Sequence, residues 1–341
     1  MTTTTLDRPA AVRGSEFAPL LREIKRCGLL ERRTGRYATS IIVNLGLLSA
    51  VWFAILAVGN SPWVLLLALP AAVLSTRTCF FGHDAGHQQI GSSRRLHDLL
   101  GLLHGNLLLG MSYGWWNDKH NRHHANPNHT DKDPDVGAGV LVWTLDQARG
   151  RTGLHGWLTR NQAWLFFPLL LLEGFNLKVA GIRDLRNRTT DRRTEGALIA
   201  VHHVAYAALL LTAMSPGLAL AFAVLHHMLF GLHLGSVFAP NHKGMEMPGE
   251  DDRWGHLDKQ VLTSRNVNGH PVTDWLMGGL NYQIEHHLFP SMPRTNLPHA
   301  QPIVRAYCRR IGIPYVTTSL LSSYRQGLQH MHNVGAELRT S

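Results

Sequence analysis

The stretch SIIVNLGLLSAVWFAILAV, Ser40 to Val58, is 19 residues long and carries no charged side chain. At about 1.5 Å per residue, a helix of this length crosses a hydrocarbon core about 30 Å thick. A second apolar run, residues 62–82, follows after only Gly59-Asn60-Ser61 and contains a single charge, Arg77. The two runs predict a transmembrane hairpin in which the Arg77 side chain extends to the polar interface.

A second hairpin is predicted further along the chain. Residues 197–214 and 216–240 contain no Asp, Glu, Lys or Arg, and the turn between them is too short for a domain. Residues 163–180 are also apolar, but Pro168 and Glu173 interrupt them. We expect this segment to lie in the membrane interface, because a crossing would put the charged segments that flank it on opposite faces.

Basic residues decide the orientation of both hairpins. The formal net charge is +10, and eight arginines and lysines precede the first span. A second basic run, RDLRNRTTDRR at 183–193, precedes the second hairpin. By the positive-inside rule, both segments lie in the cytoplasm. We therefore expect an all-α, multi-pass integral membrane protein with four spans, a basic segment over residues 1–39, and both termini on the cytoplasmic face.

The polar segments 83–162 and 241–341 should form a helical cap on that face, within one domain that covers residues 40–341. No secretory signal is readable at the N-terminus. The three cysteines are too few and too widely spaced for a disulfide framework or a CxxC zinc site. Because the positive charge flanks membrane segments, we expect lipid headgroups or an acidic protein as anionic partners, and no nucleic acid.

Three histidine clusters fall in the cap, close to the ends of the spans. HDAGH begins at His83, HNRHH begins at His120, and QIEHH ends at His287. Spacings of three and four residues place such rings on one face of a helix. Imidazole binds iron, zinc, copper or nickel, and seven histidines are too many for one ion. The clusters predict a site for two metal ions.

In these strings, and in NPNHTDKDPDV from Asn126, the chain resembles the membrane fatty-acid desaturases. The likeness covers roughly residues 40–297. Because its third cluster begins with glutamine, the chain resembles in particular the front-end branch of that family. The resemblance implies a di-iron centre held by the cluster histidines and by one histidine just after the last span. These expected ligands are His83, His87, His120, His123, His124, His242, His286 and His287.

Residues beside the ligands are expected to orient them, because a metal-bound imidazole normally donates its other N–H to a carboxylate or carbonyl. The candidates for this supporting role are Asp84, Asp133, Asp135, His233, Asn241, Gln283 and Glu285. Trp115, Trp116 and Tyr282 flank the clusters and are candidates for lining an acyl tunnel, with anchoring at the membrane interface as the alternative. The other histidines of the spans, expected to pack between helices, are His202, His203, His226 and His227.

The resemblance implies an oxidoreductase that introduces a cis double bond into an acyl chain carried by CoA, a carrier protein or a lipid, with O₂ as co-substrate. No haem motif of a cytochrome b5 domain is readable, so the electrons are expected from a separate ferredoxin or cytochrome with its reductase. A hydroxylase or another tailoring oxidase on the same centre is the nearest alternative, because the first hydrogen abstraction is shared. The alternative of another class is a membrane zinc-binding protein without enzyme activity.

Overall fold

The computed structural model describes residues 16–187 and 191–340. Within these ranges the chain is helical almost throughout, as predicted, and the strands described are two short ones, β1 (Asn266–Val267) and β2 (Thr317–Thr318), which pair in parallel. Parts of the predicted basic segment at 1–39 and of the basic run at 183–193 lie outside the described residues.

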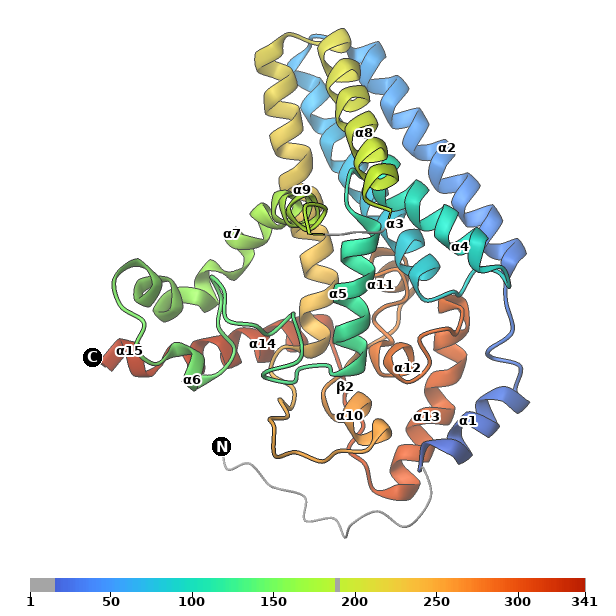
Figure 1. The fold of residues 1–341 in the computed structure, drawn as a ribbon, viewed down its shortest axis with the longest axis vertical. Helices are drawn as coiled ribbons and strands as arrows, with labels where there is room; N and C mark the ends of the chain where they lie inside the picture. The colour runs from blue at the N-terminus through green and yellow to red at the C-terminus, as the bar shows by residue number, and fades with distance from the viewer. Residues whose placement is uncertain (1–15, 188–190, 341) are drawn as a thin grey trace.

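Both predicted hairpins consist of helices that are long and apolar enough to cross a membrane. In the first, α2 (Thr34–Val58) is followed by the 3-10 helix η1 (Pro62–Leu67) and α3 (Ala68–Gly86). In the second, α8 (Arg192–Ala213) is followed by α9 (Pro216–His242). Figure 1 shows the four long helices bundled at one end of the molecule, roughly along its long axis.

The segment expected in the interface belongs to a longer helix, α7 (Gly153–Asp184), which continues through Pro168. By length and composition, α7 is a fifth helix able to span a membrane among the described residues. Its direction differs from that of the other four, because it crosses α9 at a steep angle (Figure 1). Helix length therefore leaves the number of spans at four or five.

α7 and α9 touch backbone to backbone where they cross. A Cβ atom added to Gly174 would overlap the carbonyl oxygen of His227, and one added to Gly231 would overlap the backbone nitrogen of Gly174. Small residues at a crossing allow this close approach between membrane helices. The crossing fixes α7 against the helix that ends at His242.

The polar parts of the chain fold into shorter helices at the other end of the bundle (Figure 1). They are α1 (Phe17–Arg26), α4 (Arg94–Gly101), the π-helix η2 (Leu102–Leu107), α5 (Tyr113–Ala125), α6 (Leu145–Ala148), α10 (His256–Leu262), α11 (Pro271–Leu276), α12 (Gln283–Leu288), the 3-10 helix η3 (Arg294–Asn296), α13 (Leu297–Ile311), α14 (Leu320–Val334) and α15 (Glu337–Thr340). A buried core joins Leu20 and Ile24 of α1 and Val304 of α13 to Ile284. This core holds α12 in place.

One buried carboxylate attaches α5 to the bundle. Glu195 of α8 accepts hydrogen bonds from Asn106 Nδ2 at 3.0 Å, Ser112 Oγ at 2.7 Å and the backbone N–H of Gly114 at 3.3 Å. Ser112 also caps α5, because its hydroxyl accepts from the backbone N–H of Trp115 at 3.2 Å. Glu195 thereby sets the start of the helix that carries the HNRHH cluster.

We predict that Gly174→Ala lowers the free energy of unfolding by about 1–3 kcal/mol, because the added methyl group forces α7 and α9 apart. Thermal unfolding of the purified protein measures the change. Gly196→Ala on α8 is the matched control, since a Cβ there meets no atom within 4 Å. Its expected effect is neutral or stabilising by up to about 1 kcal/mol, because alanine favours a helix over glycine. Equal unfolding temperatures for both variants would contradict the close crossing.

Candidate metal centre

The eight histidines predicted from the sequence meet in one buried region where α3, α5, α9 and α12 come together. His83 lies in the last turn of α3 and His87 follows its end, while His242 is the last residue of α9. The others project from α5 (His120, His123, His124) and α12 (His286, His287). None of the eight is more than 9% exposed. Four separate segments therefore contribute to one water-poor site.

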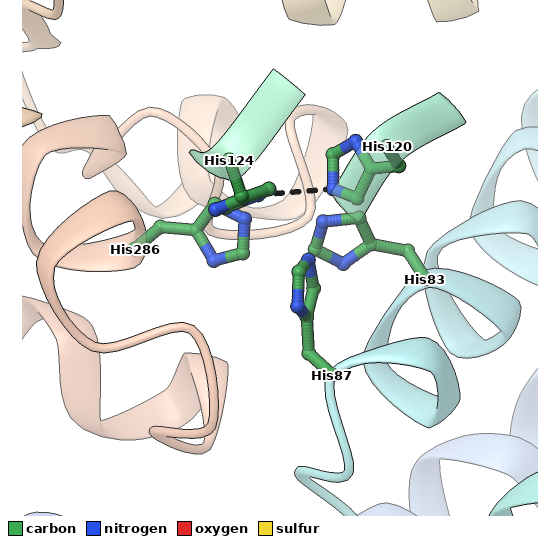
Figure 2. A group of neighbouring side chains, drawn as sticks. All are labelled: His83, His87, His120, His124 and His286. Atoms are coloured by element: carbon green, nitrogen blue, oxygen red, sulfur yellow. Dashed lines mark hydrogen bonds between the residues drawn. The ribbon is translucent and has the colours of Figure 1, made fainter. Parts of the chain in front are cut away.

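The rings form two adjoining groups. In the first group, shown in Figure 2, one ring nitrogen from each of five histidines lies within 4.8 Å of the others: His83, His87, His120, His124 and His286. In the second group, nitrogens of three histidines meet the same limit: His123, His242 and His287. The groups adjoin where the rings of His124 and His287 stack with centroids 4.2 Å apart. Two sets of donors side by side suit two ions better than one.

The nitrogens in the middle of these groups are largely without hydrogen-bond partners in the described part of the chain. They include Nε2 of His83, His87 and His287, Nδ1 of His124, and both ring nitrogens of His286. His120 and His124 are paired only with one another among the rings drawn, through their Nε2 atoms at 3.1 Å (Figure 2). Buried polar atoms without partners are uncommon in proteins, and each one calls for a ligand, an ion or a water.

Four of the histidines on α5 and α12 are in the protonation state that metal binding requires. Burial, followed by the proximity of the other rings, lowers the pKa of His120, His124, His286 and His287 well below its ordinary value. These imidazoles are therefore neutral at physiological pH, and each has a lone pair to offer. An all-imidazole donor set of this kind fits a first-row metal such as iron.

Carboxylates hold two of the rings. His83 Nδ1 lies 3.1 Å from Asp84 Oδ1, and the other oxygen of Asp84 pairs with Arg294 Nε at 3.0 Å. His123 Nδ1 donates to Asp133 Oδ2 at 2.8 Å, and Asp133 also accepts from the backbone N–H of Asn128 at 2.7 Å. The loop that carries NPNHTDKDPDV thus wraps around a carboxylate that sets the direction of His123.

Neutral oxygens hold two more rings. His242 Nδ1 donates to the carbonyl oxygen of Thr263 at 3.0 Å. His287 Nδ1 donates to Gln260 Oε1 at 3.0 Å, and Gln260 Nε2 donates to the backbone carbonyl of His124 at 2.9 Å. One amide side chain therefore ties α12 to α5. Bonds of this type direct the opposite nitrogen, Nε2, of each ring to the centre of its group.

Gln283 lies next to His242 at the edge of the second group of histidines. Its Nε2 lies 3.0 Å from His242 Nε2, and Asn241 Nδ2 donates to its Oε1 at 3.4 Å. Asn241 is itself anchored to the carbonyl oxygens of Val237 and Leu280, each at 3.1 Å. Both residues therefore lie beside the histidines of the second group.

Two other predicted supporting residues face elsewhere. The carboxylate of Glu285 accepts from Asn266 Nδ2 at 2.6 Å and from the Tyr315 hydroxyl at 2.7 Å, so it connects α12 to β1. His233 Nε2 bonds to the carbonyl oxygen of Leu276 at 3.0 Å, next to α11. Asp135, by contrast, lies 3.5 Å from His123 Nδ1 and forms an ion pair with Lys119.

A small apolar pocket lies beside His83 and is lined in part by Cys79, Leu109, Met111 and Trp116. The indole ring of Trp116 stacks on His120 at a centroid distance of 4.5 Å. The other two predicted lining residues are placed differently. Trp115 packs against the core around α9, and the Tyr282 hydroxyl lies 3.3 Å from Asp274 Oδ2.

Gln260, Thr263 and Arg294 are the supporting residues that sequence reasoning missed. They lie outside the histidine strings, in segments with no recurring spacing of their own. Only the fold brings them to the rings, so no signal in the sequence alone indicates their role.

Comparison with known proteins places these features in context. The family model described as fatty acid desaturase matches residues 60–319. The chain is 30% identical to the acyl-lipid (9-3)-desaturase of Physcomitrium patens over 87% of this chain and 58% of that protein. It is also 30% identical to the Delta(6)-fatty-acid desaturase fat-3 of Caenorhabditis elegans, over 81% of this chain and 66% of that protein. The chain thus spans less than two thirds of the length of these relatives.

We predict that Asp133→Asn weakens metal retention about 10–100-fold, because the acceptor that orients His123 loses its charge. Retention is measured as the chelator concentration that removes half of the bound metal. The control is Asp131→Asn, a change of an exposed side chain two residues earlier in the sequence, and its metal retention should equal that of the wild type. Equal retention in both variants would show that Asp133 does not support the centre.

Proposed function

The chain belongs to the fatty acid desaturase family, and from this premise we propose that it introduces a cis double bond into a fatty acyl chain with O₂ as co-substrate. One observation carries the proposal: eight buried histidines form two adjoining groups beside an apolar cavity. The relatives are named for desaturation of fatty acids at positions close to the carboxyl end, and the glutamine at position 283 agrees with that branch.

We assign one iron ion to each group of histidines. The first ion would be held by His83, His87, His120, His124 and His286, and the second by His123, His242 and His287. Removal of hydrogen from an unactivated methylene needs a strong oxidant, which no side chain provides. Bound iron would supply it by activating O₂. In the balanced reaction, two neighbouring hydrogens, two external electrons and two protons reduce O₂ to two molecules of water.

The residues around the centre bind the chain and keep water away. The cavity beside His83 presents mainly apolar side chains, so it favours an acyl chain over solvent. Trp116 lies over His120 and separates this ring from the surroundings. The outer hydrogen bonds of His83, His123, His242 and His287 hold those rings in fixed directions. The donors are thus preorganised, and the water-poor lining strengthens electrostatic interactions within the site.

We further propose that Gln283 serves the second ion. Its amide nitrogen occupies the lone pair of His242 Nε2 when no metal is present. A half-turn of the amide group presents the carbonyl oxygen instead, either to a metal directly or to a water on it. Asn241 Nδ2 donates to Gln283 Oε1 at 3.4 Å in the orientation of the structure, and this bond is exchanged for the metal contact when the amide turns.

The membrane arrangement that we propose has four spans, α2, α3, α8 and α9, with α7 in the interface. The steep crossing of α7 over α9 supports this arrangement (Figure 1), and so does the basic charge on the segments before each hairpin. Residues 40–341 then act as one desaturase domain whose cap and termini face the cytoplasm. A separate ferredoxin or cytochrome delivers the electrons there, and the acyl chain arrives on CoA, a carrier protein or a lipid.

We predict that expression of the protein with a matching electron donor adds a new double bond to the host's fatty acyl chains, detected by mass spectrometry of the lipids. His286→Ala should abolish the product, because it removes one of the five rings whose nitrogens lie within 4.8 Å of one another in the first group. His332→Ala, on the exposed surface of α14, should leave the product unchanged.

Two results would contradict the proposed reaction. An unchanged lipid profile across several donors and chain lengths would argue against any oxidation of acyl chains. Retention of an oxygen atom in the product would identify hydroxylation in place of desaturation.

We predict that Gln283→His retains bound iron and part of the activity, because an imidazole there supplies a donor at the same place. Gln283→Met, of similar length, should lower the iron content, since it offers no hard oxygen or nitrogen donor. Iron per chain and product yield are measured on both variants, with the exposed Gln329→Met as the control. If Gln283→Met matches the wild type in both measures, the amide has no part in the centre.

A further inference from the structure

A second cluster of polar side chains is buried between the candidate spans and includes none of the eight histidines. Lys178 of α7, His202 and Tyr206 of α8, His226 of α9 and Ser75 of α3 all line one small cavity. Ionisable residues between membrane helices are costly and rare, and they commonly mark sites for a ligand or an ion. The cluster therefore calls for an explanation beyond helix packing.

The imidazoles of the cluster are already held by the protein. His202 Nδ1 donates to the carbonyl oxygen of Leu107 at 3.0 Å, so its Nε2 is an acceptor. His226 lies between the Ser75 hydroxyl, at 3.2 Å from Nε2, and the Tyr206 hydroxyl, at 2.9 Å from Nδ1. When His226 accepts from Ser75, its Nδ1–H donates to Tyr206, and the Tyr206 O–H remains to donate to a ligand.

Lys178 is the charge-bearing group of the cavity. Its side chain is only 8% exposed, and its Nζ lies 3.3 Å from His202 Nε2. This bond uses one of three N–H groups of the ammonium ion. Within residues 16–187 and 191–340, no carboxylate forms an ion pair with Lys178. A buried cation without an opposite charge is unfavourable, and an anion in the cavity would relieve the cost.

The position of this cavity suggests where the anion comes from. Leu109 lines both this cavity and the apolar one beside His83. Ser75 and His83 are eight residues apart on α3, which is roughly 12 Å along the helix axis. An apolar chain that lay beside His83 and continued past Leu109 would run towards Lys178. A methyl terminus would gain nothing from an ammonium ion there, whereas a carboxylate would form an ion pair with it.

We propose that the cavity around Lys178 binds a carboxylate carried on an apolar chain, with Lys178 as its ionic partner and the Tyr206 hydroxyl as a second donor. Two kinds of molecule carry such a carboxylate: a dicarboxylic acyl chain, through its distal end, and a free fatty acid that enters with its carboxylate first. The inference takes from the proposed function only the premise that an apolar chain passes His83.

The test is equilibrium binding of three chains of equal length to the purified, metal-containing protein: hexadecanedioate, hexadecanoate and the neutral hexadecanol. Lys178→Met should weaken binding of at least one acid about tenfold or more, and change that of the alcohol less than about twofold. A loss confined to the diacid assigns the distal carboxylate, and a loss for both acids assigns the single one. Val179→Met, the exposed neighbour on α7, is the matched control and should bind all three chains like the wild type.

Unchanged affinity for both acids in a folded Lys178→Met protein would overturn the inference. If that variant does not fold, Tyr206→Phe removes the second donor without changing the shape of the side chain, and acid affinity equal to that of the wild type would overturn it in the same way. Lipid analysis in parallel separates this inference from the proposed function. If a new double bond forms but acid binding does not depend on Lys178, only the carboxylate site is contradicted. If acid binding depends on Lys178 but no oxidised product forms, the carboxylate site stands and the proposed function is contradicted.

Discussion

The constraint on which the rest of the structure depends is the packing of eight buried imidazoles whose ring nitrogens lie close together in two adjoining groups. Such an arrangement is unfavourable in a protein alone, because buried nitrogens such as those of His286 have no hydrogen-bond partner among the described residues. Metal ions bound to the lone pairs would remove this cost, so the fold and the metal would stabilise each other. The centre therefore requires four segments, α3, α5, α9 and α12, to be held at fixed distances.

Several polar contacts in the cap meet this requirement. Glu195 ties the start of α5 to α8, Gln260 ties α5 to α12, and Asp84 with Arg294 connects the end of α3 to the segment after α12. Each of these contacts joins residues far apart in the chain. The close crossing of α7 and α9 adds the apolar counterpart, since it braces the helix that ends at His242.

The sequence predicts the parts of this design that depend on local spacing. Apolar length is enough to find the four helices of the two hairpins, and the three-and-four spacing of histidines is enough to find seven of the eight clustered rings, because both follow from helix geometry. It does not predict contacts made by the fold, such as those of Gln260 and Arg294. For the same reason the sequence could not show that Trp116 lines the pocket beside His83 and Tyr282 does not. Glu285 is adjacent to His286 in the sequence, but its carboxylate accepts a hydrogen bond from Tyr315. Helix α7 shows the limit of composition, because length allows a span while its crossing angle supports an interfacial position.

Metal analysis of the purified protein is the most direct test of the account. Two groups of imidazoles, each with its own ion, predict about two irons per chain and little zinc. A stoichiometry of two should fall in variants of either group, with His124→Ala affecting both ions because its ring lies where the groups adjoin. One zinc per chain and no iron would contradict the account and leave a metal-binding membrane protein in its place.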